Sequence, residues 1–478
     1  MAEVVSRRFD VACRNYPDRV AVFDGDGTPI SFERLYYSVH SIAQTLIDHG
    51  VRQKHVVALR VGGLSARLAL SLAVLRIGSG LALFDHELPK AGGKNGVDHY
   101  VVDEPTEVPS GLPVLRLDAS WLRPIDRAVP QRGVGGIIVG TSGTTGTPKY
   151  QAMSEAVVLA RQDLSTRVHG PQEGPTLIGF NPATSAGFRM SVAALTLGQT
   201  QIWQHSDPVK TLQAMNSVSA RNAQLPTYLL RLLLDAARRF EGPMPKLEQI
   251  LVGGAILSPD LAAEAEEIFG CRVYTGYGST ESGGVCYFRI TDAPEALGTV
   301  GKIPKQFNHK FLGENGEVAE SGELYLQIPK EVRGSAYLNA QGPYDADGWL
   351  ATGDIGFVGA DGNLVLTGRR SEYINAGGTK RAPEYFEASL ARLPGVQSVA
   401  AFALDNGWGS DDAGVALVAN RERVSDEELR EALSQGVPGG LVFRIFFVKE
   451  IPVSAAGKVS RKELADQYRD RTADLVVG

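Results

Sequence analysis

Helical and strand-like segments alternate between residues 20 and 270, and this alternation constrains the fold more than any other feature of the sequence. Apolar residues recur at helical spacing over 33–49, and an apolar strand at 56–61 precedes a second helical segment at 64–75. The same order continues, with strands expected at 81–84, 136–139, 176–180, 201–203 and 249–252, and helices expected after Ser154, after Gly187, and over 226–239 and 259–269. Regular alternation of this kind predicts layered α/β subdomains.

The pattern changes beyond residue 299, where turn dipeptides separate short alternating segments. β-Hairpins are expected there and near the start of the chain, with turns predicted at Asn315-Gly316, Ser321-Gly322, Asp361-Gly362 and 24–27. After Arg370, helices are expected near 384–393 and 426–433. We therefore expect an α/β fold with two domains. A large N-terminal domain over 1–370 combines layered α/β subdomains with a β-rich subdomain, and a small α+β domain occupies 371–478.

Composition narrows the classes of function. The chain has 478 residues, 43% of them hydrophobic, which is enough apolar material for a sizeable core. Lys and Arg total 48 against 54 Asp and Glu, and this acidic balance disfavours a nucleic-acid partner. The longest apolar stretch, 68–84, contains Arg76 and is too short to span a membrane, so we expect a buried helix followed by a strand. Three cysteines without disulfide or metal spacing, and no signal segment at the start, favour the cytoplasm.

The sharpest chemical signal is a loop rich in hydroxyl groups and glycine that follows the strand at 136–139. It reads Thr141-Ser142-Gly143-Thr144-Thr145-Gly146-Thr147-Pro148-Lys149. Glycines let the backbone turn tightly and bring N–H groups toward an anion, while the hydroxyls and the lysine add further donors. A polyphosphate needs such groups. The spacing is not that of a Walker loop, because Pro148 intervenes and no Ser or Thr follows Lys149.

Four further segments carry groups suited to a nucleotide. Gly276-Tyr277-Gly278-Ser279-Thr280-Glu281 combines an aromatic ring that can cover a purine, a hydroxyl for a phosphate and a carboxylate for a hard cation. Thr352-Gly353-Asp354 offers a carboxylate for ribose hydroxyls, and Gly368-Arg369 follows it. Lys458 lies on a glycine-containing loop, where a single lysine is commonly only solvated. Each segment is weak evidence by itself.

Together and in this order, the five segments resemble the adenylate-forming superfamily, which includes acyl-CoA synthetases, adenylation domains of nonribosomal peptide synthetases and luciferases. The resemblance extends from Ile30 through Lys458. It implies a large N-terminal domain and a small mobile C-terminal domain. It also implies a two-step reaction, in which a carboxylate attacks the α-phosphate of ATP and expels pyrophosphate, and a thiol then displaces AMP.

The resemblance also implies roles for individual residues. It places the β- and γ-phosphates at Thr141, Ser142, Gly143, Thr144, Thr145 and Lys149. It places adenine and the acyl group beside Gly253, Gly254 and Ala255, and it places the ribose at Asp354 and Arg369. Tyr277 is expected to stack on adenine, Thr280 to contact the α-phosphate and Glu281 to bind Mg²⁺. Lys458 is expected to bridge the substrate carboxylate and the phosphate. Ser371 occupies the hinge position, and Gly377-Gly378 resembles the segment past which pantetheine enters in acyl-CoA synthetases.

The region expected to bind the acid departs from the family. Asn181 stands near the position of an aspartate in amino-acid-activating relatives, and Thr184 replaces a histidine common in acyl-CoA synthetases. An unpaired buried ammonium would be costly, so we expect an acid without an α-amino group. The other candidate residues are mostly small, which favours a bulky apolar, aryl or polycyclic acid, although small residues also simply pack in cores. They are Phe180, Gly187, Ala223, Gly278, Gly283, Gly284 and Cys286.

We therefore expect an AMP-forming acid–thiol ligase that uses ATP, Mg²⁺ and CoA. No carrier domain is expected after Lys458, so the acceptor must come in trans, and phosphopantetheine on a separate carrier protein is the alternative to CoA. Luciferase-like oxygenation is not excluded by motif. A binding protein that has lost catalysis is disfavoured, because Lys149, Glu281, Asp354, Arg369 and Lys458 are all present. The identity of the acid and the oligomeric state, a homodimer included, stay open.

Overall fold

The computed structural model describes residues 4–24, 27–83, 96–105, 111–125, 127–141, 149–170, 172–292, 298–313, 315–376, 379–407, 410–434, 441–454 and 458–477. The chain forms two compact units. The first comprises Met1–Asn308 and Leu326–Leu350, and the second comprises His309–Tyr325 and Ala351–Gly478. The predicted domain boundary at residue 371 stays a prediction. Within the described ranges, no helix is both long enough and apolar enough to cross a membrane.

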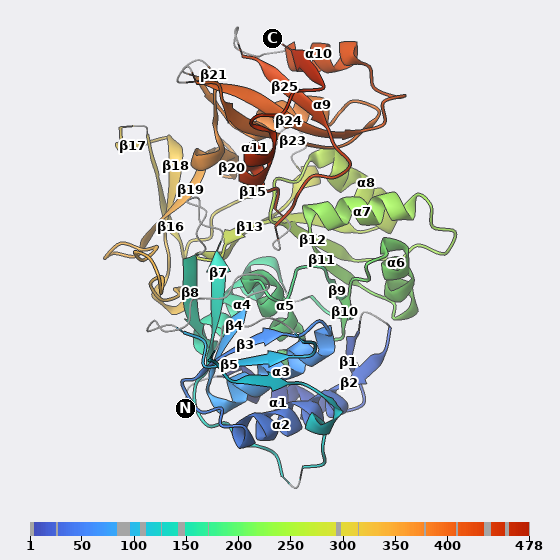
Figure 1. Cartoon of the computed structure of the whole chain (residues 1–478), viewed down its shortest axis with the longest axis vertical. Helices are drawn as coiled ribbons and strands as arrows, with labels where there is room; N and C mark the ends of the chain where they lie inside the picture. Colours follow the sequence, from blue (N-terminus) through green and yellow to red (C-terminus); the bar gives the residue numbers. More distant parts are fainter. Residues whose placement is uncertain are drawn as a thin grey trace. The chain divides into compact units, whose positions relative to one another are not determined.

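One mixed sheet of the first unit has six strands in the order β6-β5-β3-β4-β7-β8 (Figure 1). Its neighbouring strands are parallel except for the antiparallel pair β7–β8. The helix α3 packs against this sheet, α1 and α2 pack on α3, and all three helices share one apolar core with the sheet. The elements are β3 (Val56–Arg60), β4 (Gly80–Leu83), β5 (His99–Val102), β6 (Val114–Arg116), β7 (Gly136–Thr141), β8 (Lys149–Ser154), α1 (Val5–Asn15), α2 (Phe32–Asp48) and α3 (Leu64–Ile77). The predicted succession of helix and strand over 68–84 is confirmed as far as Leu83.

A second sheet of the first unit has eight strands in the order β14-β13-β12-β11-β9-β10-β1-β2. Only the edge pairs β1–β2 and β13–β14 are antiparallel. The strands are β1 (Val20–Phe23), β2 (Pro29–Ser31), β9 (Thr176–Ile178), β10 (Gln201–Trp203), β11 (Asn222–Pro226), β12 (Gln249–Gly253), β13 (Arg272–Ser279) and β14 (Gly283–Arg289), and β15 (Thr299–Gly301) follows later in the chain.

Helices cover both faces of this second sheet. On one face, α6 (Pro208–Ser217), α7 (Thr227–Ala237) and α8 (Pro259–Phe269) pack on a core that includes Ile250 and Val252 of β12. Leu251 points to the opposite face, because side chains alternate along a strand. There it meets residues of α4 (Glu155–His169) and α5 (Ser185–Thr196). The face covered by α4 and α5 is the one that matters for the candidate site.

Three features of the first unit differ from the prediction. α1 was not predicted, although Val5, Phe9, Ala12 and Cys13 have helical spacing and are buried. α5 begins at Ser185 rather than after Gly187, because Thr184 Oγ1 accepts the Gly187 N–H at 3.1 Å and caps the helix there. β13 does not end near residue 274 but continues through Ser279, so most of the Gly276–Glu281 motif lies in a strand.

In the second unit, five strands are neighbours in one sheet in the order β20-β19-β18-β16-β17, and the pairs β16–β17 and β19–β20 are antiparallel. They are β16 (Asn308–Leu312), β17 (Val318–Ala319), β18 (Ser321–Gln327), β19 (Trp349–Val358) and β20 (Leu364–Arg369). The hairpin turn predicted at Ser321-Gly322 is wrong, because these residues begin β18, which pairs with β16 and not with β17. Gly322 has φ +148°, and a Cβ there would lie 2.2 Å from Leu312 O, so the glycine permits close strand contact.

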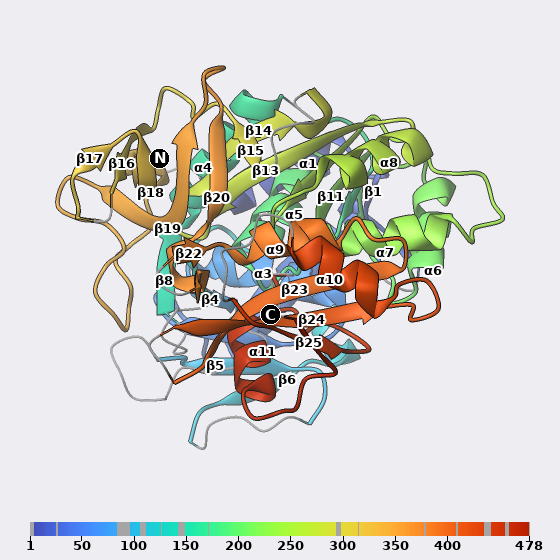
Figure 2. The same ribbon diagram turned by 90° about the horizontal axis from the view of Figure 1, so that it is seen from above.

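The remainder of the second unit is a four-stranded sheet in the order β23-β24-β25-β26 with helices on both faces (Figure 2). α9 and α10 share a core with Ala401, Val415 and Ile445, whereas α11 packs on the opposite face beside Phe446. The elements are β23 (Val396–Asp405), β24 (Asp411–Ala419), β25 (Phe443–Phe447), β26 (Leu475–Val477), α9 (Pro383–Leu390), α10 (Asp426–Ser434), α11 (Arg461–Tyr468) and the ribbon β21 (Ile374–Ala376) with β22 (Thr379–Arg381).

Candidate active site

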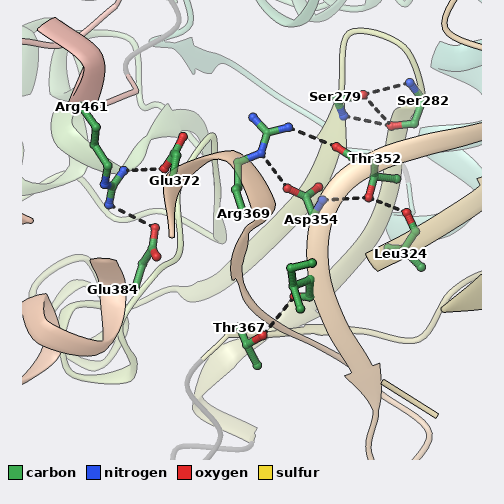
Figure 3. Close-up of polar contacts among 11 residues, drawn as sticks. Ser279, Ser282, Leu324, Thr352, Asp354, Thr367, Arg369, Glu372, Glu384 and Arg461 are labelled. Carbon is green, nitrogen blue, oxygen red and sulfur yellow. Dashed lines mark hydrogen bonds and ion pairs between the residues drawn. The ribbon is translucent and has the colours of Figure 1, made fainter. Parts of the chain in front are cut away.

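The tight turn between β13 and β14 carries two of the predicted catalytic residues, Thr280 and Glu281. Two serines close it. The Ser279 N–H donates to Ser282 Oγ at 2.9 Å, and the Ser282 N–H donates to Ser279 Oγ at 3.1 Å (Figure 3). The Glu281 N–H also donates to Ser279 Oγ, at 3.2 Å. The serines therefore hold the backbone on both sides of Thr280 and Glu281.

A buried arginine of α4 binds the same turn. Arg161 is 3% exposed, and its Nη1 and Nη2 donate to the carbonyl oxygens of Thr280 and Glu281 at 2.7 and 2.6 Å. Its Nε donates to Val332 O at 2.8 Å. Burial lowers the pKa of Arg161 to about 10, so the side chain remains charged at neutral pH and makes charge-assisted hydrogen bonds. Arg161 belongs to no motif, and sequence analysis did not find it.

Two tyrosines also contact Glu281, one at its side chain and one at its backbone. Tyr337 Oη donates to Glu281 Oε1 at 2.5 Å, and Tyr344 Oη donates to Glu281 O at 2.7 Å. Lys149 Nζ lies 5.4 Å from the centroid of the Tyr337 ring, within cation–π distance. The structure thus brings Lys149 and Glu281, predicted from separate motifs, to one ring. Sequence analysis recognised neither tyrosine.

The carboxylate of Glu281 is suited to a cation that has other ligands from a substrate. Tyr337 occupies Oε1, whereas no described residue donates to Oε2. Within the described ranges, no group of three or more His, Cys, Asp or Glu side chains could hold a metal by itself. A cation at Glu281 would therefore take most of its ligands from phosphates and water. Mg²⁺ prefers this kind of coordination, so the residues present fit a magnesium–nucleotide complex.

Glycines beside the turn bring backbone and an aromatic ring close together. Gly253 at the end of β12 is in register with Gly276 of β13. A Cβ at Gly253 would lie 3.3 Å from Gly276 O and 3.6 Å from Phe180 Cζ. Gly254 follows with φ +92°, which L side chains rarely adopt. Tyr277 is half-buried on the neighbouring strand, and Ala255 is exposed.

In the second unit, the two residues predicted at the ribose form a pair across β19 and β20. Arg369 Nε lies 2.9 Å from Asp354 Oδ1, and Arg369 Nη2 donates to Thr352 O at 3.1 Å (Figure 3). Thr352 Oγ1 accepts the Asp354 N–H at 3.1 Å and donates to Leu324 O at 2.7 Å. The hydroxyl of Thr352 therefore anchors the strand segment that presents the Asp354 carboxylate.

Other predicted site residues lie on the second unit, at the end of β7 in the first unit, or outside the described ranges. The Lys458 N–H donates to Ser454 Oγ at 3.3 Å, and the Ser454 N–H donates to Lys458 O at 2.7 Å. Ser371 is exposed in a single helical turn, Arg370–Glu372. Thr141 ends β7. Ser142, Gly143, Thr144, Thr145, Gly377 and Gly378 lie outside the described residues. The roles of all these residues stay predictions.

Two of the small residues predicted in the acid pocket are small because backbone lies against them. A Cβ at Gly187 would lie 2.1 Å from Asn181 O, and a Cβ at Gly278 would lie 2.0 Å from Gly283 O. Ala223 is fully buried in the core on the α6–α8 face of the sheet. The small size of Gly187 and Gly278 therefore does not measure room for a ligand. The bulky apolar acid stays a prediction.

Comparison with known proteins agrees with this site. The family model described as AMP-binding enzyme matches residues 136–334, which include Lys149, Arg161, Glu281 and Val332. A salicylyl-CoA synthase / salicylate adenylyltransferase from a Streptomyces species is 27% identical over 520 residues, covering 96% of this chain and 93% of that protein.

Two solved structures share the fold. An O-succinylbenzoate coenzyme A synthetase from Bacillus subtilis, in complex with AMP, matches with a TM-score of 0.82 and 21% identity, covering 98% of this chain and 99% of that one. An amide bond synthetase from Marinactinospora thermotolerans matches with a TM-score of 0.78 and 22% identity, covering 97% and 100%. The chain carries an AMP-binding enzyme domain and belongs to the adenylate-forming superfamily.

Proposed function

We propose that the protein is an AMP-forming acid–thiol ligase that activates a carboxylic acid with ATP and transfers the acyl group to CoA. One observation carries the proposal. Lys149 and Glu281, which come from separate motifs, meet at the Tyr337 ring, beside a turn that Arg161 holds in place. This arrangement offers a cation for phosphates and a carboxylate for a metal ion. The similar salicylyl-CoA synthase supports acid activation followed by thioester formation.

In the first step, a carboxylate oxygen of the acid attacks the α-phosphorus of ATP, the bond from that phosphorus to the bridging oxygen breaks, and pyrophosphate leaves. Two anions must approach, so positive charge near both lowers the barrier, and a fixed orientation removes much of the entropic cost. Lys149 binds the outer phosphates, Thr280 binds the α-phosphate, and Lys458 neutralises the attacking carboxylate. Glu281 would hold Mg²⁺, which when bound neutralises part of the phosphate charge.

Each unit carries residues to which this proposal assigns a part of the nucleoside. Tyr277 stacks on adenine beside the backbone of Gly253, Gly254 and Ala255. Asp354 accepts hydrogen bonds from the ribose hydroxyls.

In the second step, a thiol sulfur attacks the acyl carbon, the bond from that carbon to the AMP oxygen breaks, and AMP leaves. We propose that the N-terminal domain over 1–370 and the C-terminal domain over 371–478 move about Ser371 between the two steps. An exposed serine in a single short helical turn can absorb such a backbone change. Asn181 offers no charge for an ammonium group, which supports an acid without an α-amino group.

The test is ATP–pyrophosphate exchange with a panel of carboxylic acids, followed by mass analysis of the product with CoA, a phosphopantetheinylated carrier protein or an amine. We expect exchange with at least one acid and a CoA thioester. Glu281→Gln should lose exchange, while Glu241→Gln, at an exposed position, should retain it. A carrier-bound product would show that the acceptor is a carrier protein instead of CoA, and an amide product would show that it is an amine. If ATP binds but no acid supports exchange, the catalytic proposal fails and a binding function takes its place.

A further inference from the structure

The first unit has a partly open cavity of about 50 Å³ between α4, α5 and the face of the eight-stranded sheet that carries Leu251. Polar residues outnumber apolar ones in its lining. It includes Gln162, Ser165 and His169 of α4, Arg189 of α5, Gln224 of β11 and Tyr287 of β14. A cavity for a purely apolar acid would be lined mainly by apolar side chains. This lining instead suits a ligand with polar atoms.

Arg189 places an uncompensated positive charge at this cavity. Its Nη1 donates to Ser165 Oγ at 3.1 Å, and among the described residues it forms no ion pair with a carboxylate. Ser165 Oγ lies 3.1 Å from Tyr287 Oη, so the neighbours of the guanidinium are neutral hydroxyls. Burial and the charge of Arg189 both lower the pKa of His169, and the ring is therefore neutral at neutral pH. No described carboxylate competes with an anion for Arg189.

The wall of the cavity is continuous with the candidate adenylation site. Leu251 and Tyr287 both line the cavity and both approach Gly276. A Cβ at Gly276 would lie 3.3 Å from Leu251 Cδ1 and 3.3 Å from Tyr287 Cε1. Gly276 directly precedes Tyr277, and Gly253 lies beside it in register. An acid that presents its reacting carboxylate near these glycines can extend its other end toward the cavity.

We propose that Arg189 selects acids that carry a second anionic group, a carboxylate or a sulfonate, at the end remote from the reacting carboxylate. This inference rests on the proposed function, because it names the substrate class of the same site. The planar guanidinium of arginine binds a carboxylate or sulfonate with two parallel hydrogen bonds, and Ser165 with Tyr287 offers hydroxyl donors beside it. Arg189 then acts as a specificity residue that contacts the substrate and not the reacting atoms.

The test compares pairs of acids that differ only at the far end. Straight-chain dicarboxylic acids of four to eight carbons and the three benzenedicarboxylic acids are each paired with the monocarboxylic acid in which a methyl group replaces the second carboxylate. ATP–pyrophosphate exchange is measured for the wild type, Arg189→Met, Arg189→Lys and Arg167→Met. Arg167 is exposed on α4, the other helix beside the cavity, and serves as the control. The ratio of kcat/KM between the two acids of a pair is insensitive to a loss of folded protein, because both acids are measured on one preparation.

We expect the wild type and R167M to prefer at least one dicarboxylic acid over its methyl partner by about 100-fold in kcat/KM, as for a desolvated charge pair. R189M should lose this preference because its kcat/KM falls with the dicarboxylic acid and not with the methyl partner. R189K should keep part of the preference. An unchanged preference in R189M, or a wild type that favours the methyl partner throughout, overturns the inference but leaves the proposed function intact.

Binding separates the two proposals if no acid supports exchange. The same acids are then added at millimolar concentration, and thermal unfolding of the wild type and R189M is compared, since a ligand that binds the folded state raises the melting temperature. A shift with dicarboxylic acids that R189M lacks supports the anion site, although the catalytic proposal has failed. Equal shifts in both proteins, or none in either, overturn the anion site as well.

Discussion

Replacing Tyr337 by phenylalanine removes one hydroxyl from the candidate active site and leaves the ring against which Lys149 lies. The lost hydrogen bond joins Tyr337 Oη to the Glu281 carboxylate at 2.5 Å. Hydrogen bonds to charged groups contribute about 1.5–3 kcal/mol. If this bond orients the carboxylate for Mg²⁺, its loss should lower kcat/KM for ATP–pyrophosphate exchange by about 10- to 150-fold, at about 1.4 kcal/mol per decade.

Tyr344 offers a matched control, because it donates a hydrogen bond to the same residue but to the backbone. Glu281 O accepts from Tyr344 Oη at 2.7 Å and also from Arg161 Nη2 at 2.6 Å, so it keeps a partner in Tyr344→Phe. We expect Y344F to change exchange by less than about fivefold, since a carbonyl that retains one strong hydrogen bond avoids most of the penalty.

The assay is exchange over a range of ATP and of Mg²⁺ concentrations, with thermal unfolding of each variant as a check on folding. Y337F should require more Mg²⁺ for half-maximal exchange than the wild type or Y344F. Equal effects of the two substitutions, or a Y337F variant with wild-type magnesium dependence, would refute the role of the Tyr337–Glu281 hydrogen bond.

Three further predictions concern other parts of the chain. Lys458→Ala should unfold at the wild-type temperature but lose ATP–pyrophosphate exchange by about 100-fold or more, because a charge partner of the transition state is removed. Lys462→Ala, on the exposed side of α11, should keep wild-type exchange. Normal exchange in K458A would remove Lys458 from the mechanism. Gly187→Ala should destabilise the first unit by about 1–3 kcal/mol, because the new Cβ meets Asn181 O, and Gly62→Ala, whose Cβ finds only an ordinary contact at 3.7 Å, should unfold like the wild type. Burial raises the pKa of Glu155 to about 7 from its ordinary 4.5, so the folded state binds this proton more tightly than the unfolded chain does. The protonated Glu155 therefore stabilises the fold fully below pH 4.5. This contribution of about 3 kcal/mol to the free energy of unfolding is lost as the pH rises through 7. Denaturant midpoints between pH 5 and 8 should therefore fall less in Glu155→Gln, and identical slopes would contradict this assignment.

Local pattern was sufficient to predict most helices and strands. The helical spacing of Leu35, Val39 and Leu46 corresponds to the buried face of α2, and the apolar run at 68–83 to α3 and β4. The observed start of a helix differs from the predicted one where a side chain caps the backbone, as Thr184 does for α5. The misplaced turn at Ser321-Gly322 arose because a glycine that allows close strand packing has the same sequence signature as a glycine in a turn.

The partners of the candidate site could not be predicted in the same way. Arg161 contacts the backbone of Thr280 and Glu281, which are 119 and 120 positions away in the chain, and Tyr337 contacts Glu281 across 56 positions. These contacts depend on how α4 and the segment after β18 pack on the β13–β14 turn. An arginine inside a helix and a tyrosine in an irregular segment carry no local pattern that indicates such a contact. Motifs predicted Lys149 and Glu281, and only the folded chain shows that they share a neighbour.

The guanidinium of Arg161 has a consequence for recombination between relatives. It joins α4, the Thr280–Glu281 turn and the 330–332 segment through backbone carbonyl groups, whose chemistry does not depend on side-chain identity. A chimera can therefore exchange residues 326–344 for those of another protein without breaking this junction, provided that the loop keeps its length and the arginine is retained. Insertions before residue 332 should disturb the turn more than many substitutions there, which makes loop length the property to conserve in designing such hybrids.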